Sequence, residues 1–113
     1  MPFIHVKTNQ TVSPEKAVQL KAALGEAITL IPGKTEQWLM VQIEDQNQLW
    51  LAGSDAPAAF ADVRLVGSAS DADYTRLTER LTELLSEVLE VAPDRVYIPY
   101  QEIGHWGWNY RNF

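Results

Sequence analysis

Hydrophobic residues recur every three or four positions in two stretches of the chain, and this period predicts two amphipathic helices. The first begins at Ser13-Pro14-Glu15, where a hydroxyl N-cap, a proline at the first helical position and an acidic residue favour a helix start. Pro32-Gly33 ends it. The second begins at Ser70 with a capping-box spacing and is closed by Pro93. The two apolar stripes are Ala17, Leu20, Leu24, Ile28 and Ile31, and Tyr74, Leu77, Leu81, Leu84 and Val88.

Four shorter stretches have the alternation or the β-branched and aromatic content of β-strands. They cover residues 3–8, 38–44, 62–66 and 95–100. The segment from Gln46 to Gly53, between the second and third stretches, is interpreted as a hairpin. The order is β-α-β followed by β-α-β, which predicts one α+β domain over residues 1–113. In this domain a four-stranded mixed sheet carries both helices on one face.

The other face of such a sheet has no element to cover it. The run Trp38-Leu39-Met40-Val41 is too apolar to be expected in water, and the chain has no further helix or strand to shield it. Self-association is the simplest cover, and a closed ring of subunits is one way to achieve it.

Composition excludes several classes of function. The net charge of −6 argues against a nucleic-acid backbone or an anionic membrane surface as main partner. The chain has no cysteine, so disulfides, thiolate nucleophiles and cysteine metal sites are excluded. His5 and His105 have no nearby acidic spacing, so no metal site is expected. No apolar run is long enough to span a membrane and no signal segment opens the chain, so the default location is the cytoplasm.

Pro2 is the first candidate catalytic residue. Methionine aminopeptidases remove an initiator methionine that precedes a small residue, so we expect Pro2 to become the N-terminus with a free secondary amine. Apolar neighbours would lower the pKa of this amine below the usual α-amino value of about 8. It could then act as a general base near neutral pH without a metal or a cofactor. Because proline also follows many start codons without any such role, Pro2 alone leaves the question open.

Aromatic residues are dense at the C-terminal end of the chain. Trp106, Trp108, Tyr110 and Phe113 fall within eight residues. They could form the apolar wall of a pocket for a flat ligand, or they could bury a sheet edge or a subunit contact. The spacing alone does not decide between these alternatives.

Several short motifs make the chain similar to a known family. They are Met1-Pro2-Phe3-Ile4, Gly33-Lys34, Leu65-Val66-Gly67, Pro93-Asp94-Arg95-Val96-Tyr97-Ile98 and Gly107-Trp108-Asn109. With these motifs the whole chain resembles the macrophage migration inhibitory factor family of the tautomerase superfamily, which includes D-dopachrome tautomerase. The C-terminal motifs are specific, whereas the Gly-Lys pair alone is weak.

The resemblance implies a homotrimer whose sheets line a central barrel, with an active site at each subunit boundary. It implies a cofactor-independent tautomerase, an isomerase that interconverts keto and enol forms of phenylpyruvate and dopachrome-like compounds. Pro2 would be the base and Lys34 the cationic contact for the substrate carboxylate or enolate oxygen. The family also includes cytokine-like members that are secreted without a signal peptide, so a signalling or ligand-binding role with incidental turnover stays open. A ferredoxin-like binding module without chemistry, as a monomer or dimer, is a third alternative.

The resemblance also implies a set of substrate-binding residues. Tyr97 matches a pocket tyrosine contributed by the neighbouring subunit, Trp108 matches a ring near the pocket mouth, and Trp38 stands where tyrosine is common. The full set is Lys34, Trp38, Leu65, Val66, Tyr97, Trp106, Trp108 and Phe113.

The chain departs from the family pattern at positions that concern the substrate. Pro99 stands where the best-known members have an asparagine that hydrogen-bonds the substrate, and proline offers no N–H. Trp106 replaces a smaller apolar residue and should reshape the cavity. Arg64 is either a second anion contact or an exposed strand-end residue. Ala58 and Ala61 fall where the vertebrate cytokine has its Cys-x-x-Cys, so no thiol redox activity is expected.

Overall fold

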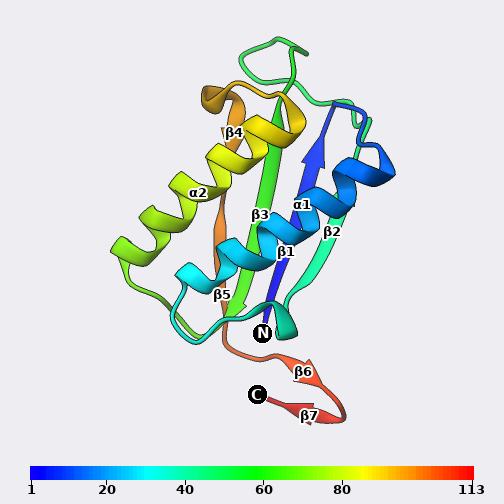
Figure 1. Cartoon of the computed structure of the whole chain (residues 1–113). Helices are drawn as coiled ribbons and strands as arrows, with labels where there is room; N and C mark the ends of the chain where they lie inside the picture. Colours follow the sequence, from blue (N-terminus) through cyan, green and yellow to red (C-terminus); the bar gives the residue numbers. More distant parts are fainter.

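The computed structural model describes residues 1–113 and has a β-α-β unit followed by a second one (Figure 1). The α+β class, with two helices on one face of a mixed sheet, is confirmed. The elements are β1 (Pro2–Thr8), α1 (Pro14–Ala27), η1 (Ile28–Leu30), η2 (Glu36–Trp38), β2 (Met40–Glu44), β3 (Ala59–Val66), α2 (Asp71–Leu89), η3 (Pro93–Arg95), β4 (Val96–Tyr97), β5 (Tyr100–Ile103), β6 (Gly107–Trp108) and β7 (Arg111–Asn112).

Both helix starts are capped as predicted. The Ser13 hydroxyl accepts a hydrogen bond from the Lys16 backbone N–H. Ser70 and Asp73 form a complete capping box, in which each side chain accepts from the backbone N–H of the other. The helix α2 ends before Pro93, because Glu90 takes the left-handed conformation with φ 57°. Local sequence chemistry therefore sets the helix ends to within a few residues.

The sheet has the order β2-β1-β3-β4, and β5 also pairs with β3. Strand β1 is parallel to β2 and antiparallel to β3. The hairpin predicted at Gln46–Gly53 is wrong, because β1 lies between β2 and β3 and uses both of its edges to pair with them. The connecting segment contains only an isolated bridge between Leu51 and Ser54.

The predicted strand boundaries differ from the observed ones by more than one residue in three places. Strand β3 begins at Ala59, three residues before the predicted start at residue 62. The 38–44 strand begins only at Met40, because residues 36–38 form the short helix η2. The 95–100 strand is divided into β4 and β5 around Pro99, which has no N–H to donate to the sheet. The Pro99 carbonyl still accepts a hydrogen bond of 3.0 Å from the Val63 N–H, so both short strands stay on β3.

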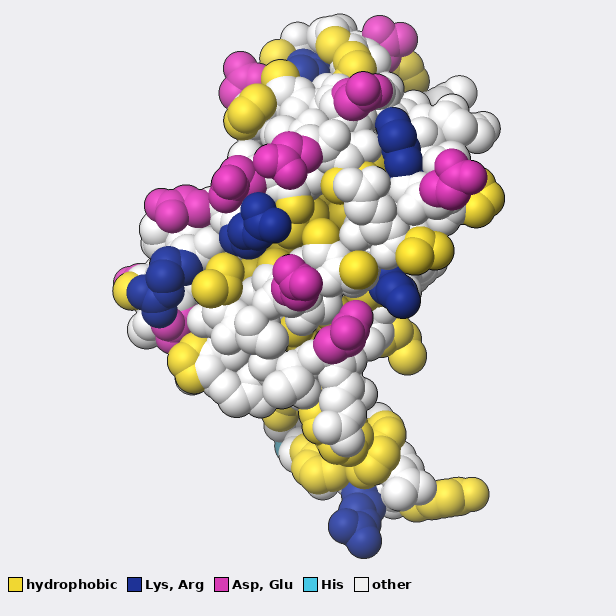
Figure 2. Space-filling model, in the orientation of Figure 1, with side chains coloured by type: hydrophobic (Ala, Val, Ile, Leu, Met, Phe, Trp, Pro, Cys, Tyr) yellow, Lys and Arg dark blue, Asp and Glu magenta, His cyan; other side chains and the backbone are white.

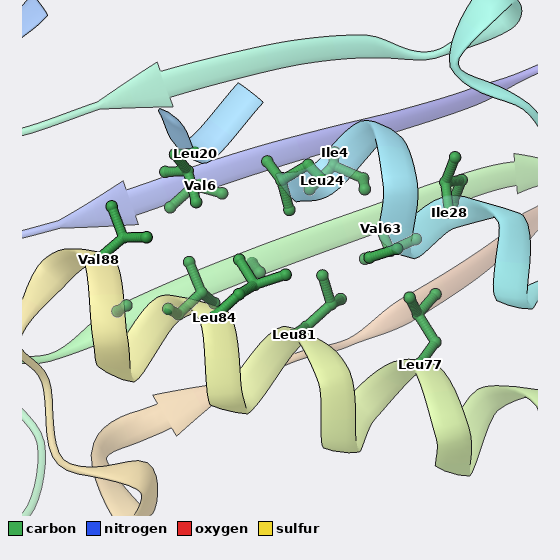
Figure 3. Close-up of a cluster of buried hydrophobic side chains, with 14 of the residues drawn as sticks. Ile4, Val6, Leu20, Leu24, Ile28, Val63, Leu77, Leu81, Leu84 and Val88 are labelled. Carbon is green, nitrogen blue, oxygen red and sulfur yellow. The ribbon is translucent and has the colours of Figure 1, made fainter. Parts of the chain in front are cut away.

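The hydrophobic core lies between the helices and the sheet. Figure 3 shows side chains of α1 and α2 directed toward those of β1 and β3. The outer face of the helices carries Lys, Arg, Asp and Glu side chains (Figure 2). None of the helices is long and apolar enough to cross a bilayer. The labelled core residues are Ile4, Val6, Leu20, Leu24, Ile28, Val63, Leu77, Leu81, Leu84 and Val88.

The opposite face of the sheet has no helix over it, as predicted (Figure 1). It is less uniformly apolar than the sequence suggested. Trp38 lies outside the strand, and of the apolar run from Trp38 to Val41 only Met40, which is 68% exposed, lies on this face. Its middle carries the pairs His5–Glu44, at 2.6 Å, and Arg64–Asp62, at 3.1 Å. This open face is therefore polar in the middle, and at the end where β1 begins the apolar side chains of Phe3 and Met40 lie next to Arg64.

Beyond β5 the chain forms an arm of residues 104–113, called the C-terminal arm below. It projects from the end of the sheet where β1 starts (Figure 1). Its strands β6 and β7 are joined by Asn109 and Tyr110, whose φ angles of 50° and 67° suit a tight hairpin turn. The backbones of Trp106 and Phe113 close the arm with two hydrogen bonds, of 3.3 and 2.8 Å.

Candidate active site

A cavity of about 420 Å³ lies at the start of the chain. Three segments form it: the first residues of β1, the turn from η2 into β2, and the C-terminal arm. Such a volume is within the range of small-molecule sites, and Gln37 is the one polar residue among the eight that line the cavity. The lining residues are Met1, Pro2, Gln37, Trp38, Leu39, Met40, Trp106 and Trp108.

Strand pairing fixes Pro2 at the inner side of this cavity. Pro2 is buried and is the cross-strand partner of Leu65, while the next residue, Phe3, pairs with Met40 of β2. The Met1 carbonyl accepts a hydrogen bond of 3.4 Å from the Val66 N–H, which extends the pairing by one residue. The chain start is therefore held by the sheet on both sides.

The aromatic residues of the cavity contact one another. The rings of Trp38 and Trp108 meet edge to face, with centroids 5.0 Å apart, and Phe113 lies 6.1 Å from Trp108. Edge-to-face contacts are a favoured geometry for aromatic pairs. The C-terminal arm is thus tied to η2 by the contact between Trp108 and Trp38.

Lys34 lies beside the chain start. Its Nζ donates a hydrogen bond of 3.0 Å to the Val66 carbonyl. Burial lowers the pKa of the Met1 amino group below its usual value, and the positive charge and hydrogen bond of Lys34 lower it further. A terminal amine in this place therefore loses its proton more readily than one in water, with a cation next to it.

The structure brings most of the candidate residues together, in different ways. Trp38, Trp106 and Trp108 line the same cavity as Pro2, and Phe113 extends the aromatic wall. Lys34 lies beside the Met1 amino group, one residue before Pro2. The Leu65 side chain is fully buried in the core, and Leu65 is the cross-strand partner that holds Pro2 in the sheet. Val66 presents its carbonyl to Lys34.

Tyr97 lies elsewhere in the subunit. It pairs with Phe60 on β3, five positions before the partner of Pro2, which corresponds to roughly 16 Å along a strand. There, 59% exposed, it lines a separate cavity of about 120 Å³ together with Trp50 and Arg95. A single chain therefore does not bring Tyr97 to Pro2.

Sequence reasoning missed Gln37, Leu39 and Met40 as cavity residues. Met40 reaches the cavity because β2 is parallel to β1 in the register that pairs it with Phe3, and a pattern along one strand does not contain that register. Gln37 is there because η2 turns next to the chain start, and no signal in the sequence indicated this. The structure contains no group of three or more His, Cys, Asp or Glu that could hold a metal.

The comparisons agree with this geometry. The family model "Macrophage migration inhibitory factor (MIF)" matches residues 1–111. The macrophage migration inhibitory factors of Meriones unguiculatus and Mus musculus are each 28% identical over 117 aligned positions, which cover 100% of this chain and 99% of the relative.

Solved structures show the same fold. The crystal structure of Leishmania major MIF2 matches with a TM-score of 0.93 and 28% identity, covering 100% of this chain and 97% of that one. The homologue from Prochlorococcus marinus has a TM-score of 0.83 at 20% identity, covers 98% of each chain, and supports the fold alone. The chain belongs to the macrophage migration inhibitory factor family, within the tautomerase superfamily.

Proposed function

We propose that this protein is a cofactor-independent keto–enol tautomerase of α-keto acids such as phenylpyruvate, or of dopachrome-like compounds, with the Pro2 amine as general base. The observation that carries this proposal is the cavity around the chain start, which combines aromatic walls with Lys34 beside the terminal amine. The family membership supports a tautomerase-type enzyme, and the substrate and the base are the proposed parts.

The proposal requires removal of Met1. While Met1 is present, the Pro2 nitrogen is an amide and has no basic lone pair. Removal would create a secondary amine at Pro2 and vacate the part of the cavity that Met1 lines. The lowered pKa of the Met1 amine supports a similar effect on Pro2, because burial and Lys34 would act on a nitrogen one residue further into the sheet.

The reaction needs only a proton to change place. The Pro2 nitrogen takes a proton from the carbon next to the carbonyl, the C–H electron pair becomes the C=C bond, and the carbonyl π pair moves to oxygen. Pro2 then returns the proton to that oxygen, so atoms and electrons balance without an oxidant. A positioned general base contributes roughly a hundred- to ten-thousandfold in rate.

Lys34 would stabilise the negative charge of this reaction. An ammonium has three N–H donors, and one of them is used by the Val66 carbonyl. Once Met1 and its amino group, which contacts Lys34, are removed, the other two are available for the substrate carboxylate or for the oxygen on which enolate charge develops. Trp38, Trp106, Trp108 and Phe113 would hold a flat, apolar substrate body.

We also propose that the active unit is a homotrimer. The sheet face without helices supports self-association, and the place of Tyr97 supports a site completed by a neighbour, since Tyr97 cannot reach Pro2 of its own chain. Light scattering coupled to size exclusion measures the subunit number directly. A monomer at assay concentration would contradict this part of the proposal.

The deciding experiment is phenylpyruvate tautomerisation by protein whose mass proves the loss of Met1. Pro2→Gly, also processed, keeps a terminal amine but loses the constrained secondary one, and should lose most of the activity. Protein that retains Met1 should be nearly inactive, because its Pro2 nitrogen is an amide. Full activity of the Pro2→Gly variant would overturn the assignment of Pro2.

The alternative is a cytokine-like signalling or ligand-binding protein in which turnover is incidental. It is favoured by the whole-length similarity to relatives that carry the name macrophage migration inhibitory factor. Capture of a partner by the Pro2→Gly variant as efficiently as by the unmodified protein would support this role. Loss of capture together with loss of turnover would favour the enzyme.

A further inference from the structure

A second pocket adjoins the Pro2 cavity. Its volume is about 320 Å³, and it is lined by Phe3, Met40, Arg64, Ile103 and Trp106. Met40 and Trp106 also line the first cavity, so the two spaces have a common wall. Four of the five lining residues are apolar, and Arg64 provides the only charge. A ligand that extends past Trp106 and Met40 from the Pro2 side therefore meets one cation.

Strand register explains why Arg64 is so near the candidate base. Pro2 is the cross-strand partner of Leu65, and Phe3 is that of Arg64, so Arg64 is one position away along β3. Successive side chains of a strand point to opposite faces, which places Arg64 and Phe3 on the open face next to the chain start. In the single subunit the Arg64 side chain is 45% exposed, and the subsite requires that the proposed trimer leave this pocket open.

The guanidinium of Arg64 is only partly used by the protein. Its Nη2 donates one hydrogen bond of 3.1 Å to the Asp62 carboxylate, which also accepts one of 3.4 Å from Gln101. Arginine has five N–H donors in a planar fork that matches a carboxylate, and no other protein acceptor bonds this one. The Asp62 side chain of this pair is only 12% exposed, so one donor of Arg64 serves to neutralise a largely buried carboxylate. The remaining donors have no protein partner, and Arg64 lines the pocket with them available for a ligand.

We propose that Arg64 forms a second anion-binding subsite and that the substrates of this protein are α-keto acids with an apolar body and a distal carboxylate. This proposal rests on the tautomerase function proposed above. The keto-acid end lies at Pro2 and Lys34, the body lies against Met40 and Trp106, and the distal carboxylate pairs with Arg64. Phenylpyruvate itself lacks this second carboxylate.

A matched pair of substrates tests the preference. We compare kcat/KM for phenylpyruvate and for 4-carboxyphenylpyruvate, which differ only by a carboxylate at the far end of the ring. A hydrogen-bonded charge pair at a partly exposed site should favour the dicarboxylate by roughly tenfold. In Arg64→Met the ratio should fall to about one. Arg80→Met, the same change on α2 at a partly exposed residue that pairs with Glu83, should keep the ratio of the unmodified protein.

A binding measurement separates this proposal from the tautomerase function. Cinnamate and 4-carboxycinnamate carry the same ring and the same number of carboxylates as phenylpyruvate and 4-carboxyphenylpyruvate, respectively, but cannot enolise. Quenching of tryptophan fluorescence reports their affinity. If no keto acid is turned over while 4-carboxycinnamate still binds about tenfold more tightly, the tautomerase function fails and the subsite stands. Equal affinity of the unmodified protein for both compounds overturns the subsite.

A second variant keeps the test decisive if Arg64→Met does not fold. Asp62→Asn leaves Arg64 in place and removes the carboxylate that competes for its guanidinium. Its affinity for 4-carboxycinnamate should rise while its affinity for cinnamate changes less. Weaker binding of the dicarboxylate by Asp62→Asn would contradict the proposed role of Arg64.

Discussion

The substitution Lys34→Met tests the electrostatic part of the candidate site. It removes the positive charge next to the chain start but keeps a flexible side chain of similar length. The Lys34 Nζ is held 3.0 Å from the Val66 carbonyl, and its charge and hydrogen bond help to lower the pKa of the terminal amine. Two separate changes in the kinetics should follow.

The first change is a lower rate at every pH. If Lys34 donates to the enolate oxygen, its removal costs one hydrogen bond to a charged group, about 1.5–3 kcal/mol. That loss corresponds to roughly a ten- to hundredfold lower kcat/KM. The second change is in the pH profile. The amine acts as a base only above its pKa, so a higher pKa moves the rising limb of the profile to higher pH.

The rising limb of the pH profile should move only part of the way toward the position expected for an ordinary terminal amine. Burial is the largest cause of the lowered pKa of the Met1 amino group, and Lys34 comes second. With the same two causes acting on the Pro2 amine after Met1 is removed, its pKa in Lys34→Met should rise but stay below the ordinary value of about 8. The assay is kcat/KM for phenylpyruvate measured across the neutral pH range. Lys34→Arg, which keeps the charge, and Lys16→Met, on the outer face of α1, are the controls. An unchanged limb and rate in Lys34→Met would refute the electrostatic reasoning.

Three further predictions concern the core, a tyrosine and the neighbouring subunit. Leu81→Ala removes a fully buried side chain and should cost about 2–5 kcal/mol in urea unfolding, whereas a loss below about 1 kcal/mol would contradict the packing described. Burial, and then the 2.6 Å hydrogen bond to Glu102, raise the pKa of Tyr74 to about 12, so the folded state holds the phenolic proton more tightly than the unfolded chain. Melting temperatures should therefore fall more steeply between about pH 10 and 12 in the unmodified protein than in Tyr74→Phe. Tyr97→Ala and Pro2→Gly should each be inactive. Mixing their subunits should restore activity, because in the proposed trimer some sites would combine an intact Pro2 with an intact Tyr97 of the neighbouring subunit. If mixing restores no activity, the active site is not shared between subunits.

The helices and the fold class could be predicted from the sequence because their determinants are local. The Ser13 and Ser70 caps and the two apolar stripes fix where each helix runs and which side it buries. The division of the last predicted strand also has a local cause, because Pro99 lacks an N–H. It was missed because the β-branched and aromatic residues around Pro99 favour one continuous strand. The hairpin prediction failed because sequence order does not indicate that β1 separates β2 from β3.

Candidate-site residues that belong to short motifs could be predicted from the sequence. Residues that reach the site only through strand register could not. Pro2, Lys34 and Trp108 belong to short segments that resemble a known family, and the structure brings them to one cavity region. Met40 joins them only through the parallel register of β1 and β2. The pocket at Arg64 likewise depends on the pairing of β3 with β1, so the sequence could name Arg64 without showing its surroundings.

Both ends of the chain border the same cavity, with Met1 and Pro2 on one side and the C-terminal arm on the other. Any fusion at the front would convert the Pro2 nitrogen into an amide, and any extension at the back would crowd the aromatic wall next to Phe113. An affinity tag at either terminus could thus produce a well-folded preparation that is silent in assays. For assays of the proposed activity, an N-terminal tag should be removed by a protease that leaves Pro2 as the first residue.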